Sequence, residues 1–123
     1  MAQTERERKT QEKTIRVIRK YGGYVYKNAQ NMYTEKGRPD LTACVPVTLK
    51  NLSKIFGENA KIGIFVGVEI KRPGLIENTS KAQEIVGRQI KEAKGLWFAI
   101  DDPDVIEGLM MKLTEDENGI IES

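Results

Sequence analysis

The chain has 123 residues, of which 39% are hydrophobic and 31% are charged, as in a globular protein with one domain and one core. It contains no histidine and a single cysteine, Cys44. These counts exclude serine–histidine and cysteine–histidine nucleophilic sites and zinc cages. A metal ion bound here would therefore be a hard cation held by oxygen, such as Mg²⁺, Mn²⁺ or Ca²⁺.

The charges are unevenly distributed along the chain. Residues 1–100 carry 19 Lys and Arg against 10 Asp and Glu, whereas residues 101–123 carry one Lys against eight Asp and Glu. A basic body suits a polyanion such as nucleic acid, although charge alone favours a solvated surface with an acidic tail. No apolar run is long enough to span a membrane or resembles a signal peptide, so we expect an intracellular protein.

The first half of the chain is predicted to contain two helices and two strands. Residues 4–21 are rich in helix formers and end at a pair of glycines, and residues 24–26 predict a strand. Residues 28–39 are polar and predict a loop, and residues 40–45, bounded by prolines, predict a second strand. Apolar residues at helical spacing in 48–56 predict a small helix within an insert over about 46–62.

The second half is predicted to contain two strands and two helices. Residues 63–71 are the strongest strand, since the apolar residues there are β-branched or aromatic. Residues 80–95 carry the apolar stripe of a helix, 96–100 predict a strand, and Asp102-Pro103 begins a helix that ends near 113. We expect the acidic tail, 114–123, to be flexible. The order of elements predicts an α/β fold with a mixed central sheet flanked by helices.

Three charged side chains are candidates for a catalytic site. Alternation places Glu69 and Lys71 on one face at the end of the strongest strand, where two charges are costly unless paired or metal-bound. Asp40 begins the preceding strand. If these strands are adjacent, Asp40 and Glu69 converge on one cation with Lys71 beside it, a set that can activate water and stabilise charge on a phosphate. The simpler alternatives are an exposed Glu69–Lys71 pair and ordinary turn chemistry at Asp40.

Four short motifs, taken together, share the pattern of a known nuclease family. They are Gly22-Gly23-Tyr24-Val25-Tyr26-Lys27, Gly37-Arg38-Pro39-Asp40, Gly67-Val68-Glu69-Ile70-Lys71 and Ser80-Lys81-Ala82-Gln83. Over about residues 7–106 the chain thereby resembles the VRR-NUC (virus-type replication-repair nuclease) branch of the PD-(D/E)XK superfamily. The resemblance implies a restriction-endonuclease-like αβββαβ core, with residues 1–123 forming one nuclease domain, and hydrolysis of DNA phosphodiester bonds with Mg²⁺ or Mn²⁺.

The resemblance also implies a substrate and a partner. Stand-alone viral members of the family are typically homodimers that cut branched DNA such as four-way (Holliday) junctions. We therefore expect a phage- or prophage-encoded endonuclease that acts as a homodimer in replication, recombination or repair in the bacterial cytoplasm. The insert over 46–62 leaves the choice of substrate open. The alternatives are a non-catalytic DNA-binding module on the same fold, and a restriction-type or exonucleolytic relative.

Residue roles follow from the same resemblance. It implies that Asp40, Glu69 and the backbone carbonyl of Ile70 bind the metal and that Lys71 acts in catalysis. Family members also carry a glutamate on the first helix, which would reach the metal directly or through water. Helical geometry places Glu7 on the same side as the apolar residues of 4–21, so Glu7 is preferred and Glu12 is the alternative.

The resemblance places Gln83 near the active site, where it would position Lys71 or the scissile phosphate. However, Ser80-x-x-Gln83 is also a capping box, which alone explains both residues. Candidate contacts to DNA phosphates are Lys27, Arg72 and Ser80. Three aromatic residues are predicted to pack in the core rather than stack on bases: Tyr24, Tyr26 and Trp97.

Overall fold

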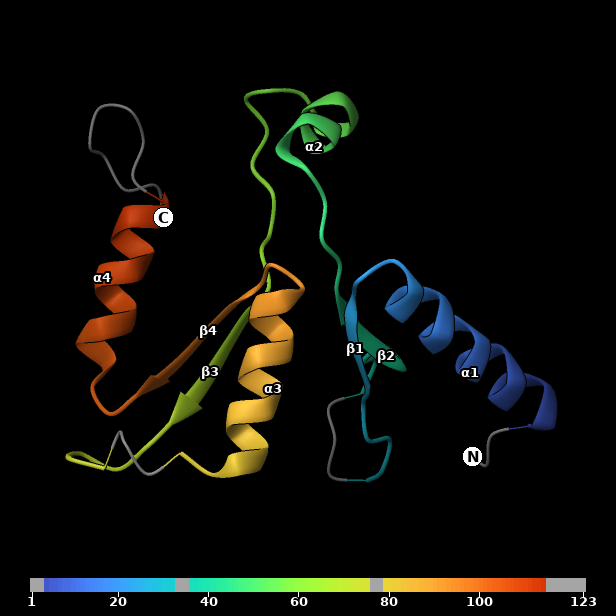
Figure 1. Cartoon of the computed structure of the whole chain (residues 1–123), viewed down its shortest axis with the longest axis horizontal. Helices are drawn as coiled ribbons and strands as arrows, with labels where there is room; N and C mark the ends of the chain where they lie inside the picture. The colour runs from blue at the N-terminus through green and yellow to red at the C-terminus, as the bar shows by residue number, and fades with distance from the viewer. Residues whose placement is uncertain (1–3, 33–35, 76–78, 115–123) are drawn as a thin grey trace.

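The computed structural model describes residues 4–32, 36–75 and 79–114, and the expected flexibility of the tail falls almost wholly outside them. Within these ranges the chain is an α/β structure (Figure 1). Its elements, in chain order, are α1 (Glu5–Lys20), β1 (Tyr24–Lys27), β2 (Leu41–Cys44), α2 (Leu49–Phe56), β3 (Val66–Ile70), α3 (Lys81–Glu92), β4 (Leu96–Ile100) and α4 (Pro103–Thr114). The element order predicted from the sequence is confirmed.

The first half of the chain forms an antiparallel hairpin against α1. β1 and β2 pair from Tyr24 opposite Cys44 to Lys27 opposite Leu41. The close approach of α1 to the hairpin requires glycine at position 23, because a Cβ there would lie 2.7 Å from the Ile18 side chain and 3.1 Å from the Cys44 carbonyl. The predicted glycine stop thus also fixes how α1 packs on β1.

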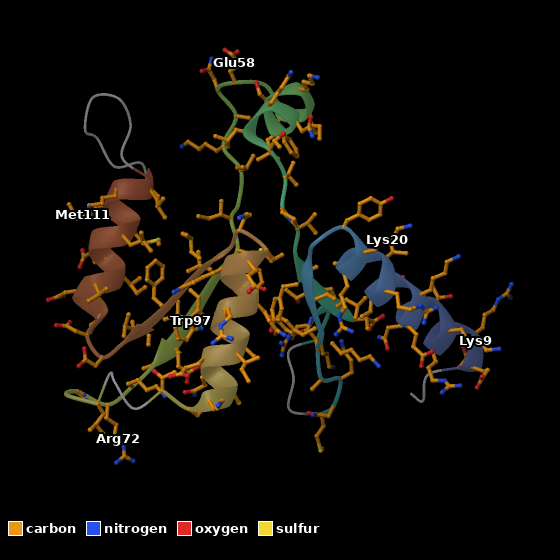
Figure 2. The ribbon with its side chains drawn as sticks, in the orientation of Figure 1. Lys9, Lys20, Glu58, Arg72, Trp97 and Met111 are labelled. Carbon is orange, nitrogen blue, oxygen red and sulfur yellow. The ribbon has the colours of Figure 1, made fainter. Side chains whose placement is uncertain are left out.

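The second half contains a parallel pair joined by a helical crossover. β3 and β4 pair from Val66 opposite Leu96 to Ile70 opposite Ile100, and α3 covers one face of the pair. A Cβ at Gly87 would lie 2.8 Å from the Trp97 ring, so glycine lets α3 approach the sheet closely. Figure 2 shows Trp97 beside α3. The prediction that Trp97 packs in the core is consistent with this contact.

The expected four-stranded mixed sheet is not formed by the described residues. β1 pairs only with β2 and β3 only with β4, as two separate two-stranded sheets. The segment between β2 and β3, residues 45–65, contains α2 and carries it away from both sheets (Figure 1). A connection of this length does not fix the pairing of two strands as a tight hairpin turn does. The α/β class is therefore established, and a restriction-endonuclease-like core is not.

The best-buried side chains lie largely where the hairpin meets the C-terminal end of α3. The buried hydrophobic residues of the described chain are Val25, Cys44, Ile90, Ala93 and Ile100. The Cys44 thiol lies 3.5 Å from the carbonyl oxygen of Ala93, to which it can donate a weak hydrogen bond. Cys44 is thus a small buried side chain at this contact. None of the helices in the described ranges has the length and apolar character needed to cross a membrane.

Candidate active site

Glu69, Lys71 and Gln83 form one connected polar corner, where the end of β3 meets the start of α3. The Gln83 side-chain amide donates from Nε2 to Glu69 Oε1 at 2.6 Å. Its Oε1 accepts from Lys71 Nζ at 2.6 Å. Lys71 Nζ and Glu69 Oε1 are themselves 4.0 Å apart, which is too long for a hydrogen bond. Gln83 is therefore the bridge that holds the two charged groups together.

The chemistry of the three groups fixes the orientation of the bridge. An ionised carboxylate only accepts hydrogen bonds and an ammonium only donates them, so the amide nitrogen must face Glu69 and the amide oxygen must face Lys71. The Lys71 side chain is 13% exposed and that of Glu69 is 33% exposed. Both charges are thus partly withdrawn from water and do not form a fully exposed surface pair.

The beginning of α3 shares the same bridge. The Ser80 side chain accepts from the Gln83 backbone amide at 3.1 Å, and Gln83 Oε1 accepts from the Ser80 backbone amide at 3.0 Å. Both halves of the predicted capping box are therefore present. The structural and functional interpretations of Gln83 do not exclude each other, because one amide oxygen accepts from Ser80 and from Lys71 at once.

Glu7 and Asp40 line a second site, which we call the α1 hollow. This hollow of about 260 Å³ is lined by Glu7, Thr10, Gln11, Thr14, Asp40 and Leu41. Both acids are exposed, and Glu12 is not among the lining residues. Of the two glutamates considered for the first helix, the structure brings Glu7 to Asp40.

A buried asparagine organises the loop that carries Asp40. Asn28 Nδ2 donates to the Pro39 carbonyl and to Thr42 Oγ1, each at 2.8 Å, and Asn28 Oδ1 accepts from Arg38 at 3.1 Å. The Asn28 backbone amide also donates to the Asp40 carbonyl at 2.9 Å. The sequence analysis missed this residue, because one asparagine at the start of a polar loop is an ordinary turn signal.

The polar corner and the α1 hollow are separate in one chain. Across residues 4–32, 36–75 and 79–114, no three His, Cys, Asp or Glu lie close enough together to hold a metal ion. Carboxylate oxygens are the ligands that Mg²⁺ prefers, so the donor types fit a hard cation. Their placement does not, since Glu7 and Asp40 lie on the hairpin side of the molecule and Glu69 lies on β3. The described residues of one chain therefore do not bring the predicted metal ligands together.

The remaining predicted site residues are exposed around these two places. Ile70 has its side chain on the opposite face from Glu69 and is 76% exposed. Arg72 follows β3 and points away from the sheet at its lower end (Figure 2). Ser80 is the N-cap of α3, and Lys27 ends β1. Arg72 and Ser80 are thus near the polar corner in sequence, while Lys27 belongs to the hairpin.

A further acid missed by the sequence analysis lies beside the polar corner. Asp101 directly follows β4, and its Oδ2 accepts from the Gly74 backbone amide at 3.0 Å. The Lys71 backbone amide donates to the Ile100 carbonyl at 2.8 Å. These two bonds tie the segment after β3 to the end of β4, so they hold the backbone that carries Lys71.

Another hollow, of about 340 Å³, contains none of the predicted catalytic residues. It lies between the start of the hairpin and the end of α3 and is lined by Arg19, Gly22, Gly23, Tyr24, Val25, Gln89, Glu92 and Ala93. Beside it, burial raises the pKa of the Tyr24 hydroxyl, and nearby Tyr26 raises it further. The Tyr24 ring also contacts Phe65 edge-on, with ring centroids 6.2 Å apart. Packing therefore accounts for Tyr24, while Tyr26 is 40% exposed.

Comparisons with protein-family models, with curated proteins and with solved structures found no match to this chain.

Proposed function

We propose that this protein is a metal-dependent endonuclease that hydrolyses phosphodiester bonds of branched DNA, with its two small sheets as parts of a restriction-endonuclease-like core. The observation that carries the proposal is the Glu69–Gln83–Lys71 corner. Its amide bonds of 2.6 Å hold a carboxylate and an ammonium side by side at the end of a parallel strand. An exposed surface pair does not require a third, half-buried side chain to align it.

The corner offers a phosphate the groups that hydrolysis requires. Lys71 carries a positive charge that can stabilise charge developing on a phosphate oxygen. The N-terminus of α3 begins at the same place, and its partial positive charge favours a phosphate there. Gln83 acts as a positioning residue, because it sets the direction of the Lys71 ammonium. Glu69 would supply a carboxylate ligand to Mg²⁺ or Mn²⁺, which as a bound ion would activate water.

A non-catalytic DNA-binding module is the second candidate, favoured by one observation. Among the residues that the structure describes, the acids expected to share a metal ion are not gathered within one chain. A protein that only binds DNA has no need to gather them. However, such a protein also has no reason to hold Glu69 beside a phosphate-binding lysine, because a carboxylate repels the DNA backbone.

The decisive experiment offers the purified protein supercoiled plasmid, linear duplex, nicked duplex and a synthetic four-way junction. Each is incubated with Mg²⁺, Mn²⁺ or EDTA, and cleavage is followed on denaturing gels. We expect metal-dependent cuts in the junction, absent with EDTA and with Asp40→Asn. Binding in gel-shift assays without cleavage under any metal would reject the nuclease and support the binding module. Digestion from free ends alone would instead indicate an exonuclease.

A further inference from the structure

Each of the four strands of the described chain has one edge without a partner strand, and the edges of β2 and β3 are of interest here. β3 pairs with β4 along one edge only, and β2 pairs with β1 along one edge only. On β3, Val68 is 42% exposed and Ile70 is 76% exposed. Unpaired edges with exposed apolar side chains are templates for pairing with another strand.

The surface of the chain is larger than that of a folded monomer. Its accessible surface is 10302 Å², whereas a monomer of 13.9 kDa has about 6,700 Å². If the 18 residues outside the described ranges are given the full surface of an unfolded chain, about 2,900 Å², about 7,400 Å² remains for the other residues. A folded monomer of that smaller size has about 6,000 Å², so the excess is about 1,400 Å². A standard protein interface covers about 800 Å² per partner. The excess is thus sufficient for a stable dimer.

The segment over 45–65 adds to this apolar surface. It stands apart from both sheets. Figure 2 shows Glu58 at the tip of this segment, at the opposite end of the view from Arg72. Its side chains more than two-fifths exposed include Val45, Val47, Leu49, Ile55, Phe56, Ile62 and Ile64. Such a projecting apolar segment is costly in water unless another chain covers it.

In the same chain β2 is not paired with β3, and the hairpin packs against the C-terminal end of α3 and, through Tyr24, against Phe65 directly before β3. Val25, Cys44 and Ala93 are 4%, 6% and 2% exposed, and they pack the hairpin against the C-terminal end of α3. A Cβ at Gly95 would lie 2.8 Å from the Cys44 sulfur, so the contact is close. Moving the hairpin onto β3 would disturb this contact, which holds three of the five buried hydrophobic residues of the described chain.

We infer that two copies of this chain pair β2 of one with β3 of the other, and that each active site is shared between them. Glu7 and Asp40 of one copy would then meet Glu69, Lys71 and Gln83 of the partner. A second copy fits better than any other partner, because each chain carries an unpaired edge on β2, an unpaired edge on β3 and both halves of the acid set. Two-fold pairing satisfies both edges at once and creates two identical sites. The chemistry of these sites rests on the proposed nuclease function, while the assembly does not.

Cross-linking tests the assembly without requiring activity. In a Cys44→Ala background, one tagged chain carries Ala43→Cys on β2 and a differently tagged chain carries Val68→Cys on β3. After co-expression, a thiol-specific linker of about 8 Å reaches opposite and diagonal neighbours on paired strands. We expect a covalent product that contains both tags and is absent when either chain is expressed alone. The absence of this product would overturn the shared assembly.

The mass of the unmodified protein tests the assembly even if the cysteine variants do not fold. Light scattering should give twice the 13.9 kDa of one chain. A mass of one chain at micromolar concentration would overturn the inference whatever the cysteine variants do.

Complementation tests whether the site is shared. Asp40→Asn and Glu69→Gln chains should each be inactive alone. Co-expressed in equal amounts, half of the dimers would be mixed, and each mixed dimer would hold one intact site, which gives about a quarter of wild-type cleavage. No recovery, beside an active wild type, would show that each site lies within one chain. An inactive wild type would instead reject the nuclease function and leave the cross-linking result to decide the assembly.

Discussion

The polar corner and the α1 hollow hold the two halves of the predicted site in different ways. In the corner, Gln83 connects two half-buried charges through hydrogen bonds of 2.6 Å. In the hollow, Glu7 and Asp40 are exposed acids, and the order comes from the backbone around them through buried Asn28. The corner is thus preorganised as a group of side chains, whereas the hollow positions a loop and leaves its carboxylates open to a ligand or a partner.

Removal of the ammonium from the corner is expected to have the largest effect on activity. Lys71→Ala takes away the ammonium that donates to Gln83 Oε1, so charge developing on a phosphate loses its donor. We expect cleavage of a four-way junction to fall by about 10²-fold or more in single-turnover assays.

Lys112→Ala, on the exposed side of α4, is the matched control and should cleave as the wild type does. Equal cleavage by both variants would remove Lys71 from the proposed site. It would also remove the functional distinction between the corner and an ordinary surface pair.

The capping box separates the structural role of Gln83 from its role in positioning Lys71. Ser80→Ala removes a cap and should lower the free energy of unfolding by about 1 kcal/mol while leaving most of the cleavage rate. Gln83→Ala removes a cap and the bridge, so it should lose a similar stability and also lower kcat by about 10-fold with little change in KM.

Urea unfolding and steady-state junction cleavage measure the two effects side by side. Gln83→Glu is the informative third variant, because it keeps the acceptor for Lys71 but places a carboxylate against Glu69. Equal kcat in Ser80→Ala and Gln83→Ala would mean that Gln83 only caps α3.

The hollow is expected to be sensitive to its buried asparagine. Asn28→Ala removes the short hydrogen bonds to the Pro39 carbonyl and to Thr42 Oγ1, and we expect the free energy of unfolding to fall by about 1–3 kcal/mol. Gln30→Ala is the control, because Gln30 is exposed and its bonds to the same loop are longer, at 3.3 and 3.4 Å. If both variants unfold at the same urea concentration, Asn28 does not organise the loop.

The smallest expected effect concerns the contact between the hairpin and the C-terminal end of α3, where Cys44 lies against Ala93. Burial raises the pKa of the Cys44 thiol above its ordinary value of 9.0, so the folded chain favours the neutral thiol. Its contribution to stability is complete below about pH 9 and is lost as the pH rises, because the unfolded thiol ionises first. Iodoacetamide at pH 8 should therefore modify Cys44 much more slowly in the native chain than in urea. Similar rates in both conditions would show that the contact between the hairpin and α3 does not shield Cys44.

The sequence by itself determined the elements and their local chemistry. For the residues that the structure describes, periodicity, glycine stops and caps placed each helix and strand within a few residues. One difference is that β3 begins at Val66 instead of residue 63, because its partner β4 begins at Leu96. Alternation brought Glu69 and Lys71 to one face, and the Ser80-x-x-Gln83 spacing predicted the capping box. These features depend on residues close together in the chain, so a local pattern is sufficient to specify them.

Only the tertiary structure decided which distant groups meet. The bridge from Gln83 to both Glu69 and Lys71 depends on how α3 docks over Gly67 and Trp97. The meeting of Glu7 with Asp40, and the separation of both from Glu69, depend on the packing of Cys44 against Ala93 and on an insert too long to set a strand register. Strand pairing across such a connection is chosen by the burial and hydrogen bonding of whole surfaces, which no short motif encodes.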